Sequence, residues 1–273
     1  MLTQGTPPGN GTLCYRAGGT AVTYRGTVPD VTSPGVLRLG RRSFGAGQRL
    51  IMARACRTPG ARGSARDQAA AMDRVHAVVA EGADIVDLGG GPAGPRTAVT
   101  ATEETRWAVP FVAAVRVAYP DLVIVAGAWR HETARELCAA GADLLDDPGE
   151  RLAGVVAECG AGLVCGDVDR AVAAGVEPAR VLVEAGTDTR PSDEATRRLE
   201  EMAAAGWPVL VSVAGPGPDA GRLAAGLAAT AVWAWLGARV FRVDQVPQTR
   251  RVLDMVSAIR GDRPPARAMR GLA

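Results

Sequence analysis

The feature that most constrains the fold is a repeat of short apolar strands, each followed by an Ala-rich segment that usually ends at a glycine. The junction recurs as EGADIVD, AGADLLDD, CGAGLVC and LGARVFR, where glycine is expected to close a helix in the left-handed conformation. Runs such as LVIVAGA at 122–128 are apolar throughout, which is typical of parallel strands buried on both faces. The repeat therefore predicts strands and helices that alternate around a parallel sheet.

Eight such units follow residue 49. Strands are expected at 49–55, 83–90, 122–128, 142–147, 162–168, 180–186, 208–215 and 238–244, and helices at 65–81, 101–118, 131–140, 150–159, 169–174, 192–205, 219–236 and 247–260. Eight units predict an α/β fold of the (β/α)8 TIM-barrel type. The alternative, an open doubly wound sheet, usually shows GxGxxG after its first strand, and RACRTPGARG is not that motif.

Two parts of the chain depart from this regular pattern. Residues 1–35 are rich in Gly, Thr and Pro, which predicts a flexible arm ending in a small hairpin, with the barrel domain at 36–273 and regular structure from about Arg49. In the fifth unit only DRAVAAGVEP separates two strands, so a shortened helix is expected there.

Composition excludes several kinds of function. The 31 basic and 29 acidic residues interleave, which argues against nucleic acid as a partner. No lysine occurs, so Schiff-base chemistry and a phosphate-loop lysine are excluded. Five scattered cysteines and two histidines predict no metal site of the zinc type, and no long apolar run predicts a membrane span. A cytoplasmic protein is expected.

Several single residues have structural interpretations. His76 and His131 are predicted to be surface or capping residues, because neither has a neighbouring acid in the pattern. Cys138, Cys159 and Cys165 are predicted to pack in the core. The tryptophans of WAWLGA, Trp233 and Trp235, are expected to pack or to form a dimer interface.

In a barrel of this type, functional side chains come from the C-terminal strand ends. The ordered segments IMxxxxxTP, GADIVDLGG, an Asp-rich strand after AAGAD, a VLV-acid strand, GWPVLV and GARVFRVxxV resemble the dihydropteroate synthase family over residues 49–261. The C-terminal segment is similar to a divergent actinobacterial second-paralogue branch of that family.

The resemblance implies a pterin-binding barrel of folate biosynthesis. Such a protein condenses 6-hydroxymethyl-7,8-dihydropterin pyrophosphate with 4-aminobenzoate and releases pyrophosphate with the help of Mg2+. It also implies a homodimer built by barrel helices.

Some family positions still carry suitable groups. The resemblance places substrate-binding residues at Asp87, Asp146, Glu184 and Arg242. Asp146 stands where the family has Asn, and Glu184 stands where it has Asp. Two interpretations of these acids remain open: with the adjacent Asp147 they bind Mg2+ through oxygen ligands, or they pair with Arg242 and Arg190.

Other family positions are degenerate. Cys56 replaces the Asn after the first strand, Gly127 replaces the pterin-contacting Asp, Pro216 replaces a Lys, and Asp244 replaces the His of an Arg-x-His phosphate motif. Smaller losses fall at 60–62, Ala128, Ala214 and Gly215, and the loop after the second strand offers only Arg96 as a replacement arginine. An acid at 244 is expected to pair with Arg242 or to repel a diphosphate.

These losses predict a protein that is catalytically inactive as a synthase and acts as a binding or partner protein linked to folate metabolism. Its partners would be a pterin or another small molecule, and a folate-pathway enzyme. The alternatives are an active dihydropteroate synthase that uses Mg2+, and a barrel enzyme with an unrelated small substrate.

Overall fold

The computed structural model describes residues 13–17, 20–24, 36–55, 65–90, 101–147, 151–185, 193–213 and 220–262. The chain separates into two compact units, Met1–Pro34 and Gly35–Ala273. In the first unit, β1 (Leu13–Ala17) and β2 (Thr20–Tyr24) form an antiparallel hairpin. The flexible character of residues 1–35 and the barrel domain at 36–273 stay predictions.

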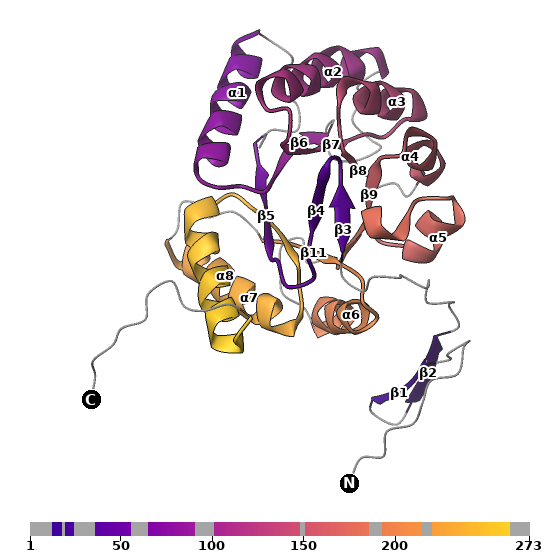
Figure 1. Cartoon of the computed structure of the whole chain (residues 1–273), viewed down its shortest axis with the longest axis vertical. Helices are drawn as coiled ribbons and strands as arrows, with labels where there is room; N and C mark the ends of the chain where they lie inside the picture. Colours follow the sequence, from indigo (N-terminus) through magenta and orange to yellow (C-terminus); the bar gives the residue numbers. More distant parts are fainter. Residues whose placement is uncertain are drawn as a thin grey trace. The chain divides into compact units, whose positions relative to one another are not determined.

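Eight parallel strands of the second unit pair in chain order, and the last strand pairs with the first to close a barrel. Figure 1 shows the helices arranged around these strands. The strands are β5 (Leu50–Arg54), β6 (Ile85–Gly90), β7 (Val123–Gly127), β8 (Leu144–Asp146), β9 (Gly162–Cys165), β10 (Val181–Glu184), β11 (Val209–Ser212) and β12 (Val240–Val243). The predicted (β/α)8 TIM barrel is confirmed.

The helices follow the strands as the repeat predicts. They are α1 (Ala65–Ala80), α2 (Ala101–Ala118), α3 (His131–Ala140), α4 (Ala153–Cys159), α5 (Val168–Ala173), α6 (Asp193–Ala204), α7 (Ala220–Leu236) and α8 (Val246–Arg260). No helix in these described segments is both long and apolar enough to cross a membrane.

The glycine junction works as the sequence predicts at the end of α3. Gly141 has a φ of 110°, and its N–H donates to the carbonyl groups of Leu137 and Cys138. A Cβ at this position would lie 2.9 Å from Cγ of Arg116. Both the backbone angle and the close neighbour therefore favour glycine here.

The fifth unit is short, as expected. Its helix α5 has 6 residues, and Asp167 caps it by accepting a hydrogen bond of 3.0 Å from the N–H of Arg170. A single 3-10 turn, η1 (Pro178–Arg180), then leads into β10. This sector of the barrel wall has less helix to cover it than the others.

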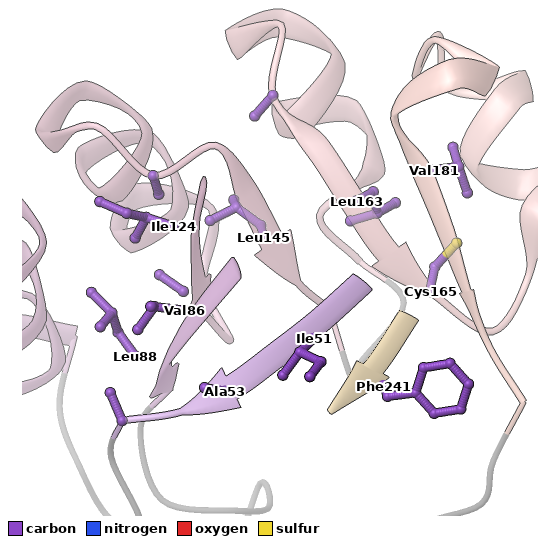
Figure 2. Close-up of a cluster of buried hydrophobic side chains, with 14 of the residues drawn as sticks. Ile51, Ala53, Val86, Leu88, Ile124, Leu145, Leu163, Cys165, Val181 and Phe241 are labelled. Atoms are coloured by element: carbon purple, nitrogen blue, oxygen red, sulfur yellow. The ribbon is translucent and has the colours of Figure 1, made fainter. Parts of the chain in front are cut away.

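The buried apolar side chains form two layers. The outer layer lies between strands and helices, and Figure 2 shows part of it, including Ile51, Ile124 and Phe241. The inner layer fills the N-terminal half of the barrel and contains Leu50, Met52, Ile85, Val123, Val125, Leu144, Val164, Leu182, Leu210 and Val240.

A second hairpin closes the inner layer. It consists of β3 (Leu37–Leu39) and β4 (Arg42–Phe44), and its side chains Leu37, Leu39 and Phe44 belong to the inner layer. Arg239 anchors it by donating 2.7 Å hydrogen bonds to the carbonyls of Phe44 and Gly45. The expectation that regular structure begins near Arg49 is therefore wrong.

Candidate functional site

The interior of the barrel changes from apolar to polar along each strand. Side chains two residues apart on a strand point to the same face, and Met52, Ile85 and Val240 point inward. The inward positions that follow toward the C-terminal ends carry polar groups on most strands. We call five of them the interior polar ring: Asp87 on β6, Asp146 on β8, Glu184 on β10, Ser212 on β11 and Arg242 on β12.

Arg242 is the centre of this ring. Its Nε lies 3.1 Å from Oδ2 of Asp87, its Nη2 lies 2.9 Å from Oδ2 of Asp146, and its Nη1 lies 3.2 Å from Oε1 of Glu184. The four ionic groups come from strands that are far apart in sequence, and the closed barrel brings them together. One guanidinium therefore faces three carboxylates.

Shorter-range contacts hold the acids in place. Ser212 donates a 3.0 Å hydrogen bond from Oγ to Oε1 of Glu184, and the N–H of Gly89 donates one of 2.8 Å to Oδ1 of Asp87. Below them, Nε of Arg242 lies 3.4 Å from Sδ of Met52, which connects the ring to the apolar inner layer. The contacts with Ser212, Gly89 and Met52 therefore hold the charged side chains of the ring in fixed positions.

Burial and charge perturb the protonation of two members. Burial raises the pKa of Asp146 to about 7; repulsion from Asp87 and Glu184 adds to this, while attraction by Arg242 opposes it. Burial disfavours the charge of Arg242, but the carboxylates of Asp87, Asp146 and Glu184 outweigh it and raise the pKa of the guanidinium. The arginine stays charged, and Asp146 changes protonation near neutral pH.

Asp244, the residue after β12, lies close to the ring but has another partner. Its Oδ2 is 3.8 Å from Nη1 of Arg54 at the end of β5, and its carbonyl accepts a 2.8 Å hydrogen bond from Arg74. Of the two expectations for Asp244, the contacts of the described residues do not show pairing with Arg242, whose guanidinium pairs with Asp87, Asp146 and Glu184. Repulsion of a diphosphate by Asp244 stays a prediction. The buried Oδ1 of Asp244 has no hydrogen-bond donor among the described residues.

Gly127 is buried at the tip of β7 and pairs in register with Asp146. By strand alternation from Val123 and Val125 it is an inward position. The barrel interior therefore has no side chain at the place next to Asp146. The neighbouring Ala128 is 1% exposed and adds no polar group.

Asp147 does not belong to the ring. Its side chain is buried, and its Oδ2 accepts a 2.7 Å hydrogen bond from the N–H of Leu152, just before α4. Consecutive strand residues point to opposite faces, so Asp146 and Asp147 cannot both face the ring. The interpretation that groups them as joint Mg2+ ligands is wrong.

The described residues do not fit a resident Mg2+. Asp146 and Glu184 direct oxygens at the guanidinium of Arg242, where a cation would meet positive charge. No group of three or more His, Cys, Asp or Glu side chains within the described ranges could hold a metal ion. Of the two open interpretations, pairing with Arg242 is the one the geometry favours.

Several predicted site positions lie outside the described residues: Cys56, 60–62, Arg96, Arg190, Ala214, Gly215 and Pro216. Two contributors are absent from the sequence-based predictions, Ser212 and Arg54. Their signal is positional, because each follows an inward apolar residue by two positions, Leu210 and Met52 respectively. The strand alternation therefore could have identified them.

Other singled-out residues lie away from the ring. His76 is exposed, with Nδ1 2.6 Å from the hydroxyl of Tyr119, and the exposed His131 has Nε2 2.9 Å from the carbonyl of Arg151. Cys165 is buried as predicted, whereas Cys138 is half-buried and Cys159 is exposed, because α3 and α4 end at the surface there. Both histidines are surface residues, as predicted.

Comparison with known proteins gives consistent matches. Residues 60–171 match the family model described as pterin binding enzyme. "Inactive dihydropteroate synthase 2" of Mycobacterium tuberculosis (strain ATCC 25618 / H37Rv) is 40% identical over 281 residues, covering 84% of this chain and 88% of that protein. The protein of the same name from Mycobacterium leprae (strain TN) is 40% identical over 284 residues, covering 85% and 98%. The solved structure of Mycobacterium tuberculosis Rv1207 superposes with a TM-score of 0.68 at 38% identity, covering 84% of this chain and 99% of that one.

Proposed function

We propose that this chain, which belongs to the dihydropteroate synthase family, is catalytically inactive as a synthase and serves as a small-molecule-binding or partner protein. One observation carries the proposal: the central cation of the ring, Arg242, is paired with Asp87, Asp146 and Glu184. A leaving pyrophosphate needs cations that are available to its developing charge. The relatives named inactive dihydropteroate synthase 2 support the same conclusion.

No lysine occurs in the chain, so no lysine from another position can replace the one that the family has where Pro216 stands here. Asp244 adds a further negative charge near the ring, paired with Arg54 at 3.8 Å. Loss of a single transition-state contact typically costs about 10²–10³ in rate. Several losses together are expected to bring condensation to background.

The test is a coupled pyrophosphate-release assay with 6-hydroxymethyl-7,8-dihydropterin pyrophosphate, 4-aminobenzoate and Mg2+. An active synthase serves as the positive control. We expect no turnover above background. Turnover that Glu184→Ala abolishes would overturn the proposal and favour the alternative, an active dihydropteroate synthase.

The small-molecule part of the proposal rests on the match to the pterin-binding family model. Calorimetric titration with the pterin, its pyrophosphate ester and pyrophosphate with Mg2+ tests each part of the family ligand separately. We expect no tight binding of the pyrophosphate ester. If a different small molecule stays bound in native mass spectrometry, the result would favour the alternative that the barrel acts on an unrelated small substrate.

A homodimer through α7 and α8 is part of the proposal. These two helices pack on one another (Figure 1), and they expose four large apolar side chains: Val232, Trp235, Met255 and Ile259. Trp233 is buried at 4% exposure, so only Trp235 of the pair is available to a partner. Exposed apolar side chains on two packed helices favour association.

The dimer is tested by size-exclusion chromatography with light scattering. We expect the wild type to elute as a dimer and Trp235→Glu to shift it toward monomer. Val117→Glu on α2 is the matched control, because Val117 is 82% exposed elsewhere on the barrel. A monomeric wild type would remove the dimer from the proposal.

A folate-pathway enzyme as partner and a cytoplasmic location also remain predictions. Affinity purification from cells is the test for the partner. A stoichiometric complex with an active synthase or another folate enzyme supports the partner role. Recovery of the chain alone would count against it.

A further inference from the structure

Two cysteine side chains meet on the outside of the barrel, away from the interior polar ring. Cys138 lies in the last turn of α3 and Cys159 is the last residue of α4, and the two helices pack side by side (Figure 1). The two side chains are in hydrogen-bond contact with each other. Both are thiols in this structure, so it shows the pair in its reduced form.

The barrel fixes the ends of these two helices next to each other. α3 ends at Gly141 and α4 ends at Gly160, and both glycines are left-handed C-caps. The strands that follow are neighbours: Leu144 of β8 pairs in register with Gly162 of β9, and the N–H of Gly162 donates a 2.8 Å hydrogen bond to the carbonyl of Asp143. Each cysteine lies within one turn of its cap, so both thiols are held at the same level of the barrel wall.

An ion pair between the same two helices places these faces together independently of the thiols. Nη2 of Arg135 on α3 lies 2.9 Å from Oε2 of Glu158 on α4. Arg135 and Cys138 are three residues apart and therefore share a face of α3, and Glu158 directly precedes Cys159. Both charged side chains are exposed, so the pair adds little stability. It does show that this face of α3 lies against the end of α4.

The two thiols differ in their access to solvent. Cys159 is exposed and Cys138 is half-buried. Burial, with the neighbouring Cys159, raises the pKa of the Cys138 thiol to about 12, so Cys138 stays protonated at neutral pH. An accessible thiol is oxidised before a buried one. Cys159 is therefore the thiol that meets an oxidant first, and Cys138 is the second thiol within its reach.

We propose that Cys138 and Cys159 form a reversible oxidation site, at which hydrogen peroxide converts the two thiols to a disulfide between α3 and α4. First, the sulfur of Cys159 attacks one peroxide oxygen, the O–O bond breaks, and Cys159 becomes a sulfenic acid as one water leaves. Next, the sulfur of Cys138 attacks the sulfenic sulfur, the S–S bond forms and the S–O bond breaks. The hydroxyl group takes the proton of Cys138 and leaves as a second water. The two thiols lose two electrons in total, which reduce the peroxide, and a dithiol reductant reverses the change by thiol–disulfide exchange.

The disulfide would close the segment 138–159, which contains β8 and most of α4. A closed loop of this kind reduces the conformational freedom of the unfolded chain. We therefore expect oxidation to raise the thermal midpoint by on the order of 5 °C. The inference does not depend on the proposed function, because neither thiol belongs to the interior polar ring.

The test is peptide mapping of the full chain after mild oxidation. Reduced protein is treated with hydrogen peroxide, its remaining thiols are blocked with N-ethylmaleimide, and it is digested with trypsin. We expect peptide 136–151 to be joined to peptide 152–170, with a mass two hydrogen atoms below their sum. Dithiothreitol should separate the two peptides and return the thermal midpoint to its reduced value.

Peptide 152–170 also contains Cys165, so Cys165→Ala is the matched control. This variant should keep both the link and the rise in thermal midpoint. Cys138→Ser and Cys159→Ser should each lose both. In Cys138→Ser the sulfenic acid of Cys159 has no thiol to react with, so trapping by dimedone at Cys159 should be several-fold higher than in the wild type.

Three results would overturn the inference. The first is that peroxide leaves the wild type without the link between the two peptides. The second is that Cys159 joins two chains, seen on a non-reducing gel, or pairs with Cys14, Cys56 or Cys165 instead. The third is equal dimedone labelling of Cys159 in the wild type and in Cys138→Ser. None of these measurements uses a pterin or pyrophosphate, so their outcome is distinct from that of the pyrophosphate-release assay.

Discussion

The pKa of Asp146 makes a prediction about stability that does not depend on any ligand. Replacing Asp146 by Asn puts a neutral group of the same shape beside Arg242, Asp87 and Glu184. The variant mimics the protonated acid, whose pKa in the folded chain is raised from 3.8 to about 7. The substitution should therefore change how the free energy of unfolding depends on pH.

The sign follows from proton binding. Between about pH 4 and pH 7 the folded state holds the proton on Asp146 while the unfolded state has released it, so wild-type stability falls as pH rises. One pKa unit corresponds to about 1.4 kcal/mol, so the full cost at neutral pH is on the order of 4 kcal/mol. Between pH 5 and pH 8 the wild type should lose roughly 2–3 kcal/mol that the Asn variant does not lose.

The assay is urea unfolding followed by tryptophan fluorescence at pH 5, 6, 7 and 8. We expect Asp146→Asn to be at least as stable as wild type at pH 8, with the difference shrinking toward pH 5. The control Asp121→Asn, which changes an exposed carboxylate in the turn before β7, should run parallel to wild type. If the curves of wild type and Asp146→Asn are also parallel across this range, the proposed balance of burial, repulsion and ion pairing at residue 146 is refuted.

Three further outcomes are expected. Phe44→Ala in the β3–β4 hairpin should lower the free energy of unfolding by about 3–5 kcal/mol in urea titration, because Phe44 is 3% exposed and closes the inner layer, whereas Val36→Ala, at 39% exposure, should cost much less. Gly127→Asp should leave pyrophosphate release at background and should lower the thermal midpoint more at pH 8 than at pH 6, because it adds an acid beside Asp146. Iodoacetamide at pH 8 should modify the exposed Cys159 before Cys138, as judged by peptide mass spectrometry. The reason is that burial and the neighbouring Cys159 raise the pKa of the Cys138 thiol to about 12. Modification of Cys138 before Cys159 would contradict this prediction.

The barrel could be predicted from the sequence because its signals are local. Most units carry an apolar strand and a terminating glycine within about one repeat, and Gly141 shows that the glycine has the backbone angle its position requires. The β3–β4 hairpin could not be predicted in this way. Its strands have three residues each, and the burial of Leu37, Leu39 and Phe44 comes from contacts with the barrel interior.

The acids and the arginine of the ring could be placed because parallel strands end at one rim of a barrel. Their partners could not be assigned, since the choice depends on depth inside the barrel. Arg242 lies at the level of Asp146 and Glu184, whereas Asp244 is two residues further along and meets Arg54 instead. Sequence spacing places two charges on one face but does not say which of several charges will pair.

The ring also shows why a retained arginine is weak support for retained catalysis. Removing Arg242 would leave Asp87, Asp146 and Glu184 together in the barrel without a counter-charge, and breaking a buried ion pair from one side typically costs about 3–5 kcal/mol. A typical domain has only about 5–15 kcal/mol of total stability. The arginine therefore stabilises the fold whether or not any reaction takes place, and groups whose loss leaves the fold intact, such as the side chain absent at Gly127, are better reporters of a change in chemistry.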